Sequence, residues 1–251
     1  ILTIILYGST FFDLYKAAWG VRDYTHAYFI LPVSLFIIWT KRKELKSLWP
    51  IVLSSSPRGS VLSFFLLLFG MLMFIFGWRQ GYLMIQTLSL IPVAFGMLWY
   101  LYGPQISRIL RFPILYLLLL VPPPTGVIDD ITLPMRYGVS MVSAAILKIL
   151  HYPIVREGLL LTMGKEEIYM GAPCSGFRSL TTMVSLGLIY LYFTRGRPSK
   201  NIILFISLIP LALLGNLIRV LSLCLVTYYF GSKVGQGFYH DFSGIIVFVI
   251  M

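Results

Sequence analysis

The stretch VLSFFLLLFGMLMFIFGWRQGYLMIQTLSLIPVAFGMLWYL, residues 61–101, decides the fold class of this chain. It holds two apolar runs, 61–77 and 82–101, on either side of the short segment WRQG. Each run approaches the ~20 residues that a helix needs to cross a bilayer. Neither run alternates between apolar and polar residues as a strand of a membrane β-barrel does. We therefore predict two membrane helices joined as a hairpin, within an all-α polytopic integral membrane protein.

The composition of the whole chain agrees with a membrane protein. Of its 251 residues, 58% are hydrophobic and 12% are charged, whereas charged residues make up about a quarter of a soluble domain. The net charge is +11, and clusters of basic residues lie in segments 41–58, 108–111 and 195–200. The positive-inside rule places such segments in cytoplasmic loops. We therefore expect a multi-pass protein of the cytoplasmic (inner) cell membrane, with the lipid bilayer and not nucleic acid as its partner.

Further apolar runs complete a predicted set of about eight transmembrane helices. The predicted spans are 1–12, 26–40, 61–77, 82–101, 112–124, 176–194, 201–220 and a last one that begins near 242. The orientation rule assigns the segments 13–25, 78–81, 125–175 and 221–241 to the outer side. No low-complexity linker divides the chain, so we predict a single membrane-embedded domain over residues 1–251. Because both chain ends fall inside apolar runs, we expect one or both of them to be truncated.

Two outer segments do not read as spans. The stretch 134–150 is amphipathic, and we interpret it as a helix lying at the outer membrane interface. The stretch IVREGLLLTMGKEEIYM, residues 154–170, places a glycine in a polar segment between two short apolar runs. This pattern predicts a small outer-face β-hairpin, and a loose interfacial loop is the alternative.

Cys174 stands in GAPCSGFRSL, residues 171–180, directly ahead of the helix that Ser175 and Gly176 begin. The N-terminus of a helix offers free N–H groups and the positive end of the helix dipole, and both lower the pKa of a thiol. Arg178, one turn further on, would add positive potential. A small residue at a tight loop-to-helix junction explains the same pattern equally well. The second cysteine, Cys224, lies in an apolar stretch, where we interpret it as a small hydrophobic filler.

Two further segments carry reactive side chains at the same predicted depth. Asn216 and Arg219 lie in LLGNLIRVLSL, and a rise of ~27 Å from residue 201 takes them to the outer boundary of the bilayer. A charge within apolar sequence is a functional hypothesis by default, and a snorkelling arginine is the alternative. His240, in GQGFYHDFSG, lies at the outer mouth of the last span. It could transfer a proton near neutral pH with Asp241 orienting it, or it could be a solvated loop residue.

Taken together, these three segments suggest acyl transfer. A cysteine nucleophile, a histidine base and an arginine that stabilises negative charge form a plausible set for that reaction. The set requires no metal ion and no cofactor, and we predict none.

The same residues resemble the motifs of the exosortase/archaeosortase family. APCSGFRSL, NLIRV and HDFSG are similar to its Cys, Arg and His motifs, and FPILYLLLLVPPP and VREGLLL also fit the family. RDYTHAYFILP resembles the family's Tyr-Ser-His-Gly element, with Thr25 in place of serine and Ala27 in place of glycine. The resemblance covers residues 19–245, and it points to Tyr24 and His26 as supporting residues.

What the resemblance implies is a membrane cysteine transpeptidase or endopeptidase. Its substrates would be exported proteins that end in a short motif, a transmembrane helix and a basic tail, of the PEP-CTERM kind in bacteria or the PGF-CTERM kind in archaea. Cys174 would be the nucleophile, His240 the acid and base, and Arg219 the stabilising cation. The active site would face the extracytoplasmic side, and a lipid headgroup, another amine or water would accept the acyl group.

Two rival functions are weighed against this one. A small-solute transporter would carry charges at the centres of its spans and paired broken helices, whereas the candidate residues here gather at one surface. A non-catalytic membrane subunit of a polysaccharide or protein export system would not need a Cys, Arg and His set.

Overall fold

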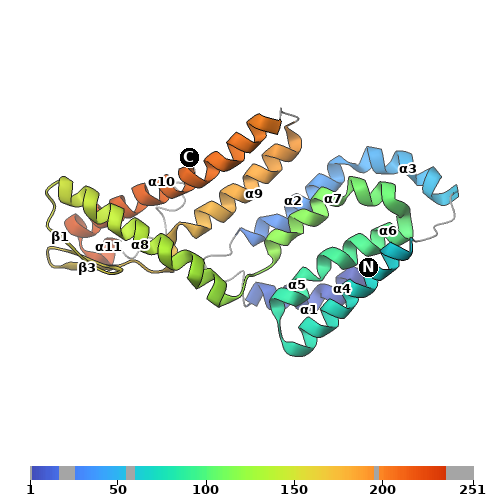
Figure 1. Cartoon of the computed structure of the whole chain (residues 1–251), viewed down its shortest axis with the longest axis horizontal. Helices are drawn as coiled ribbons and strands as arrows, with labels where there is room; N and C mark the ends of the chain where they lie inside the picture. Colours follow the sequence, from blue (N-terminus) through green and yellow to red (C-terminus); the bar gives the residue numbers. More distant parts are fainter. Residues whose placement is uncertain (1, 17–25, 55–59, 195–197, 236–251) are drawn as a thin grey trace. The chain divides into compact units, whose positions relative to one another are not determined.

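The computed structural model describes residues 2–16, 26–54, 60–194 and 198–235 (Figure 1). It divides into two compact units, Ile1–Pro124 and Thr125–Met251. The last predicted span, from residue 242, lies outside the described residues. Among the described residues, three helical segments are long and apolar enough to cross a membrane: Val61–Gln80, Leu83–Ile109 and Pro198–Phe230. The described residues therefore do not confirm eight spans, and the helices at 27–40, 111–120 and 177–193 are apolar but shorter.

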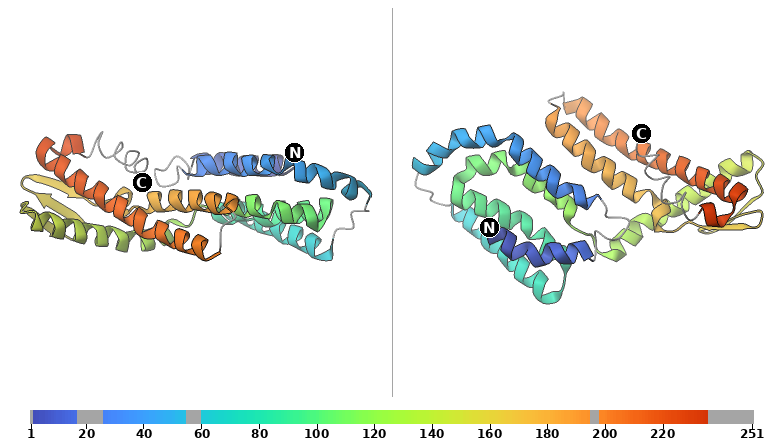
Figure 2. Two further views of the ribbon diagram at one scale, coloured as in Figure 1. Left: turned by 90° about the horizontal axis from the view of Figure 1, so that it is seen from above. Right: turned by 180° about the vertical axis from the view of Figure 1, so that it is seen from behind.

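The predicted hairpin is confirmed and forms the centre of the first unit. It consists of α4 (Val61–Gln80), α5 (Leu83–Leu88) and α6 (Leu90–Ile109) (Figures 1 and 2). Gly81 closes α4 with a φ of 70°, a left-handed conformation that glycine adopts without a steric penalty. Glycines bring the helices together, because a Cβ on Gly77 would lie 2.6 Å from the backbone N of Gln86. Such close approach through small residues is how membrane helices pack.

This packing predicts a stability effect at Gly77. We expect Gly77→Ala to lower the free energy of unfolding by about 1–3 kcal/mol, because the added methyl group must push α4 away from the Gln86 backbone. Thermal unfolding of the purified chain in detergent measures the effect. Gly8→Ala is the matched control, since a Cβ at Gly8 of helix α1 meets nothing within 4 Å. Equal unfolding temperatures for the two variants would contradict the close approach of α4 and α5.

The remaining helices of the first unit correct several predicted loops. They are α1 (Leu2–Leu14), α2 (Ala27–Thr40), α3 (Arg42–Ser54), α7 (Arg111–Tyr116) and the 3-10 helix η3 (Leu117–Leu120). The basic stretch KRKELKSLWP belongs to helix α3 from Arg42 onward, and residues 104–109 of GPQISRILR belong to α6. Within α6 the chain turns at Gly103, with φ 83° and ψ 174°, directly before Pro104. This kink allows the helix to change direction and continue where the sequence predicts a loop.

The second unit combines helices with a small sheet. Its helices are α8 (Thr125–Ile149), the 3-10 helix η4 (Ala172–Ser175), α9 (Phe177–Phe193), α10 (Pro198–Phe230) and α11 (Ser232–Val234). The strands β1 (Ile154–Glu157), β2 (Leu160–Met163) and β3 (Glu166–Tyr169) form an antiparallel meander in the order β1-β2-β3. The prediction of a two-stranded β-hairpin over residues 154–170 is therefore wrong, because the sheet has three strands. Gly164 provides the expected turn between β2 and β3, and Gly158, with a φ of 61°, provides a second turn that the sequence pattern did not reveal.

The core of the second unit explains why α10 is longer than predicted. The expected span ends at residue 220, but α10 has 33 residues and is ~50 Å long, well beyond the ~30 Å of hydrocarbon in a bilayer. Its apolar continuation packs against the sheet, where Leu223 and Cys224 join Leu161 and Ile168 in one buried cluster with Leu147 of α8. Residues 221–230, which the orientation rule assigns to the outer side, are therefore a continuation of the helix and not a separate connecting segment. Helix α8 likewise begins at Thr125, not at 134.

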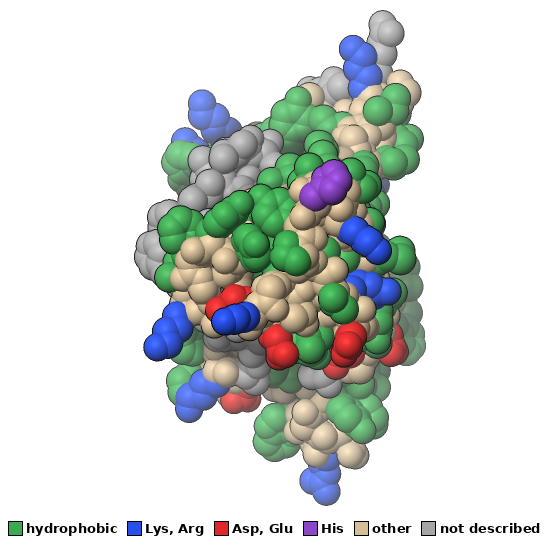
Figure 3. All heavy atoms as spheres, turned by 90° about the vertical axis from the view of Figure 1, so that its left-hand side faces the viewer, with side chains coloured by type: hydrophobic (Ala, Val, Ile, Leu, Met, Phe, Trp, Pro, Cys, Tyr) green, Lys and Arg blue, Asp and Glu red, His purple; other side chains and the backbone are tan. Residues whose placement is uncertain are grey.

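The sheet end of this unit carries charged side chains on its surface (Figure 3). The exposed charged residues of the sheet and α11 are Arg156, Glu157, Lys165, Glu167 and Lys233. A mixed charged surface is typical of protein in contact with water. The sheet therefore has the character of a cap outside the hydrocarbon, resting on the far end of α10.

Candidate active site

Cys174 lies in η4, between the end of the sheet and the start of α9. Its N–H donates a hydrogen bond to the carbonyl oxygen of Gly171 at 3.0 Å, which closes the short helical turn. The Cys174 side chain is 4% exposed and belongs to the cluster that fills the space between the sheet, α8 and α10. The thiol is therefore enclosed where the sheet packs on α8 and α10.

The segment that holds Cys174 is fixed by two side chains of α10. Asn216 Nδ2 donates a hydrogen bond to the carbonyl oxygen of Cys174 at 2.8 Å. Arg219 Nη1 donates to the carbonyl oxygen of Pro173 at 3.2 Å. Because the two donors lie three residues apart, they share one face of the helix and bind two consecutive carbonyl groups. The predicted juxtaposition of Cys174, Asn216 and Arg219 is present in the structure.

Ser175 and Gly176 provide the turn between η4 and α9. Ser175 Oγ accepts a hydrogen bond from the N–H of Phe177 at 3.2 Å, at the first residue of α9. Gly176 has a φ of 78°, and a Cβ placed there would lie 2.8 Å from Asn216 Cβ and Cγ. Both the backbone conformation and the contact with Asn216 therefore require glycine. This turn allows α10 to approach the Cys174 carbonyl closely.

We expect Gly176→Ala to disturb the site more than an ordinary glycine substitution. The left-handed conformation alone costs about 1–2 kcal/mol for alanine, and the methyl group would also displace the Asn216 amide. Gly158→Ala isolates the first effect, because Gly158 has a φ of 61° but its nearest neighbour is the Tyr137 hydroxyl at 3.8 Å. Thermal unfolding and the rate of Cys174 alkylation measure the two effects. Matching values for the two variants would contradict the packing of Gly176 on Asn216.

Burial raises the pKa of the Cys174 thiol, and nearby positive charges offset only part of the increase. The charge of Arg219, a backbone hydrogen bond at Gly171 and the charge of Arg136 lower this pKa, in that order of size. The predicted lowering is therefore wrong in direction. The physical reason is the enclosure of the thiol in an apolar cluster, which disfavours the thiolate. The left-handed residue Gly176 also separates the cysteine from the start of α9, so the thiol is not part of that helix terminus.

Arg178 does not contribute as predicted. It lies in the first turn of α9, partly buried, where its carbonyl oxygen accepts hydrogen bonds from the hydroxyls of Thr181 at 3.0 Å and Thr182 at 2.8 Å. The cations that lower the pKa of Cys174 are those of Arg219 and Arg136, and not that of Arg178.

Arg136 is the site residue that sequence reasoning missed. It projects from α8, which packs against η4, and its side chain is 11% exposed. Its Nη2 donates to Thr132 Oγ1 at 3.2 Å and lies 3.4 Å from Asp129 Oδ1. The signal available in the sequence was the spacing of Asp129, Thr132 and Arg136, which places all three on one face of a helix.

The structure does not test the other predicted site residues as neighbours of Cys174. Tyr24, His240 and Asp241 lie outside the described residues. His26 belongs to the first unit, where it precedes α2, is 7% exposed and accepts a hydrogen bond from the Phe29 N–H on its carbonyl oxygen at 3.0 Å. Within the described ranges, no group of three or more His, Cys, Asp and Glu side chains could hold a metal ion.

Comparison with known proteins gives one family. The family model described as transmembrane exosortase matches residues 19–251. Neither the curated proteins nor the solved structures yield a significant match. The matched range includes both the first unit from residue 19 onward and the whole of the second unit, with the Cys174 segment inside it.

Proposed function

The chain belongs to the transmembrane exosortase family, and on that premise we propose that it is a membrane cysteine transpeptidase or endopeptidase. Its substrates are exported proteins that end in a sorting motif, a transmembrane helix and a basic tail. The observation that carries the proposal is how α10 holds Ala172–Ser175, the cysteine segment. Asn216 and Arg219 donate hydrogen bonds to the carbonyl groups of Cys174 and Pro173 in this segment. A nucleophile needs a fixed position relative to the group that it attacks. These two hydrogen bonds hold the backbone on either side of the thiol in one position.

The first half of the reaction transfers the acyl group to the enzyme. Cys174 Sγ attacks the carbonyl carbon of the scissile peptide bond, and a C–S bond forms while the C–N bond breaks. The thiol proton passes through His240 to the leaving amine, which departs with the substrate's transmembrane helix and basic tail. Because burial raises the pKa of Cys174, the thiol carries its proton at rest, so a base must remove it during the attack. His240 is our candidate for that base, and Asp241 is our candidate for orienting it.

The second half releases the acyl group. An amine, such as that of a lipid headgroup, or water attacks the thioester carbonyl, a C–N or C–O bond forms, and the C–S bond breaks. His240 takes the proton of the attacking group, and the thiol regains a proton at the end of the cycle. A thioester therefore links the two halves, and the choice of acceptor decides between transpeptidation and hydrolysis.

Arg219 has two roles in this proposal. At rest, one of its five N–H donors binds the Pro173 carbonyl. Among the residues that the structure describes, its charge is also the largest influence that lowers the pKa of Cys174. The same charge stabilises the oxyanion that develops on the substrate during attack. Arg136 adds a second, weaker positive potential from α8.

We place the site at the extracytoplasmic face of the cell membrane. The charged surface of the sheet and the basic clusters at 41–58, 108–111 and 195–200 favour this orientation. The substrate helix enters laterally from the bilayer, and Arg178 is proposed to line its path. Co-expression with an exported reporter that carries such a tail tests the function, because an active enzyme shortens the reporter by the length of the tail.

A further inference from the structure

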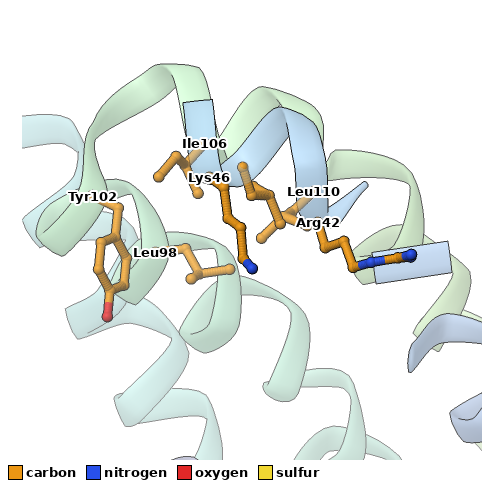
Figure 4. Close-up of a pocket in the computed structure, with 7 residues that line it drawn as sticks. Arg42, Lys46, Leu98, Tyr102, Ile106 and Leu110 are labelled. Carbon is orange, nitrogen blue, oxygen red and sulfur yellow. The ribbon is translucent and has the colours of Figure 1, made fainter. Parts of the chain in front are cut away.

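The first unit contains a cavity far along the chain from the cysteine segment (Figure 4). It lies between α3 and α6, with a volume of about 330 Å³, which is within the range of small-ligand pockets. Its apolar lining consists of Leu45, Leu98, Tyr102, Ile106 and Leu110. The kink of α6 at Gly103 divides this lining, because Leu98 and Tyr102 precede it and Ile106 follows it. The cavity therefore sits at the point where α6 changes direction.

Two cations of α3 complete the lining. The Arg42 guanidinium lies 3.8 Å from the centre of the Trp39 ring, and Arg42 Nη1 donates to the carbonyl oxygen of Trp39 at 3.1 Å. Lys46, one turn further along α3, extends toward Leu98 (Figure 4). Among the described residues, the lining includes no carboxylate. The nearby Glu44 forms an ion pair with Lys41 at 3.0 Å. Its carboxylate is therefore paired with a lysine that does not line the cavity.

The α3 helix has the arrangement of an interfacial helix. Leu45 and Leu48 pack on the buried cluster of Ile106, Leu110 and Ile114, while Lys43 and Ser47 are exposed. A helix with one apolar face and basic residues on the other lies at the headgroup level of a bilayer and is attracted by anionic lipids. The aromatic side chains of Trp39 and Tyr102 beside the cavity are typical of the same level.

We propose that this cavity binds one anionic phospholipid of the surrounding bilayer, with an acyl chain against the apolar lining and the phosphate at Arg42 and Lys46. Charge complementarity favours this occupant, because the phosphate of an anionic lipid carries a charge that the lipid itself does not balance, whereas the phosphate of a zwitterionic lipid is balanced by the ammonium group of its own headgroup. The guanidinium of Arg42 is already positioned by Trp39, and a planar guanidinium is suited to a phosphate. The proposal is independent of Cys174, and its outcome does not affect the proposed enzymatic activity.

The test compares two lipids with identical acyl chains on the full purified chain in a neutral detergent. Dioleoylphosphatidylglycerol is the anionic probe and dioleoylphosphatidylcholine is the neutral one. Native mass spectrometry measures the dissociation constant of the first bound lipid. Since each basic residue near an anionic surface contributes about fivefold in affinity, two residues should give about a thirtyfold preference for the anionic lipid.

Two double variants separate the cavity from net charge. Arg42→Gln with Lys46→Gln should abolish the preference, whereas Lys43→Gln with Arg79→Gln removes the same charge from exposed residues outside the lining and should retain it. A third variant, Leu98→Phe, fills part of the apolar lining and should weaken both lipids, provided that its unfolding temperature matches that of the wild type. Equal affinities of the wild type for the two lipids would overturn the proposal. An equal loss of preference in both double variants would do the same, because it would assign the effect to overall charge.

Discussion

Cys174→Ala should leave the reporter full-length in the membrane, with its C-terminal helix and basic tail still attached. In the proposed reaction, the thiol is the group of the enzyme that forms a covalent bond to the substrate. Removal of a nucleophile from an enzyme of this type costs on the order of 10⁶-fold in rate, which is below detection in a cellular assay. Immunoblotting of the reporter measures the result, since cleavage shortens the reporter by a whole helix. The Cys174 side chain is small, so we expect the alanine variant to keep its fold.

Cys224→Ala is the matched control for this prediction. Cys224 is fully buried in the same cluster as Cys174 but lies on α10, where it packs against the sheet. Its loss should cost about 1 kcal/mol of stability through a small cavity and leave cleavage intact. If Cys174→Ala cleaved the reporter at the wild-type rate, Cys174 would not be the nucleophile. If both variants failed equally, the cluster itself would be what activity requires.

The second large effect is expected at Arg219. Arg219→Gln should slow cleavage by about 10²–10³-fold, which is the usual cost of one donor to a developing oxyanion. It should also change how the thiol titrates. Because the charge of Arg219 is the largest influence that lowers the pKa of Cys174, its removal should raise that pKa further. The pH at which Cys174 becomes reactive then moves upward, and the rate of alkylation by iodoacetamide, measured against pH, shows the shift.

Two neighbouring arginines supply the controls for Arg219. Arg136→Gln should move the alkylation profile in the same direction by a smaller amount, because its charge is the weaker of the two. Arg178→Gln should leave the profile in place, since its charge is not among the causes of the Cys174 shift. An unchanged profile in Arg219→Gln, or a larger shift in Arg178→Gln than in Arg219→Gln, would contradict this account of the thiol's electrostatics.

The parts of the fold that were predictable are those in which one segment decides its own structure. The runs 61–77 and 82–101 are apolar throughout and separated by a short polar turn, and they form the predicted hairpin. The run 176–194 likewise appears as α9. Basic segments such as 41–50 were misread as loops, because charge indicates where a chain meets water but not whether it is helical there. In α3, packing of Leu45 and Leu48 on α6 and α7 stabilises a helix.

The cap was less predictable because it depends on tertiary packing. The apolar residues after Arg219 have the composition of a membrane span, but their partners are the strands and α8. Strand β1 was the one that the sequence pattern did not predict, since it has four residues and most of its side chains are exposed. Local sequence therefore predicts neither the number of strands in the sheet nor the length of α10.

Around Cys174, sequence reasoning predicted neighbouring residues better than it predicted the pKa of the thiol. The level of Arg219 and Asn216 followed from the rise of a helix, and both reach the cysteine segment. The pKa of the thiol depends instead on how deeply Cys174 is enclosed and on Arg136, which comes from a different helix. Neither the burial of Cys174 nor the proximity of Arg136 can be inferred from GAPCSGFRSL itself. The contributions of His240, Tyr24 and Asp241 stay predictions.

The geometry around Cys174 also bears on the rival functions. A transporter would need charged or unwound segments at the centre of its spans. In the part of the chain that the structure describes, Arg219 instead lies where α10 meets the cysteine segment beneath the sheet. A non-catalytic export subunit would leave the tailed reporter uncut, so the cleavage assay with Cys174→Ala separates the enzyme from that alternative.

The central claim is that Cys174 forms a thioester with the substrate, and the mass of the trapped enzyme tests it most directly. The purified chain is mixed with the tailed reporter without an amine acceptor, quenched in acid, and analysed by intact mass and peptide mapping. We predict an adduct equal in mass to the reporter upstream of the cut, attached to Cys174 and released by hydroxylamine. Cleaved reporter accumulating while Cys174 stays unmodified, or cleavage that persists after Cys174 is alkylated, would contradict the account.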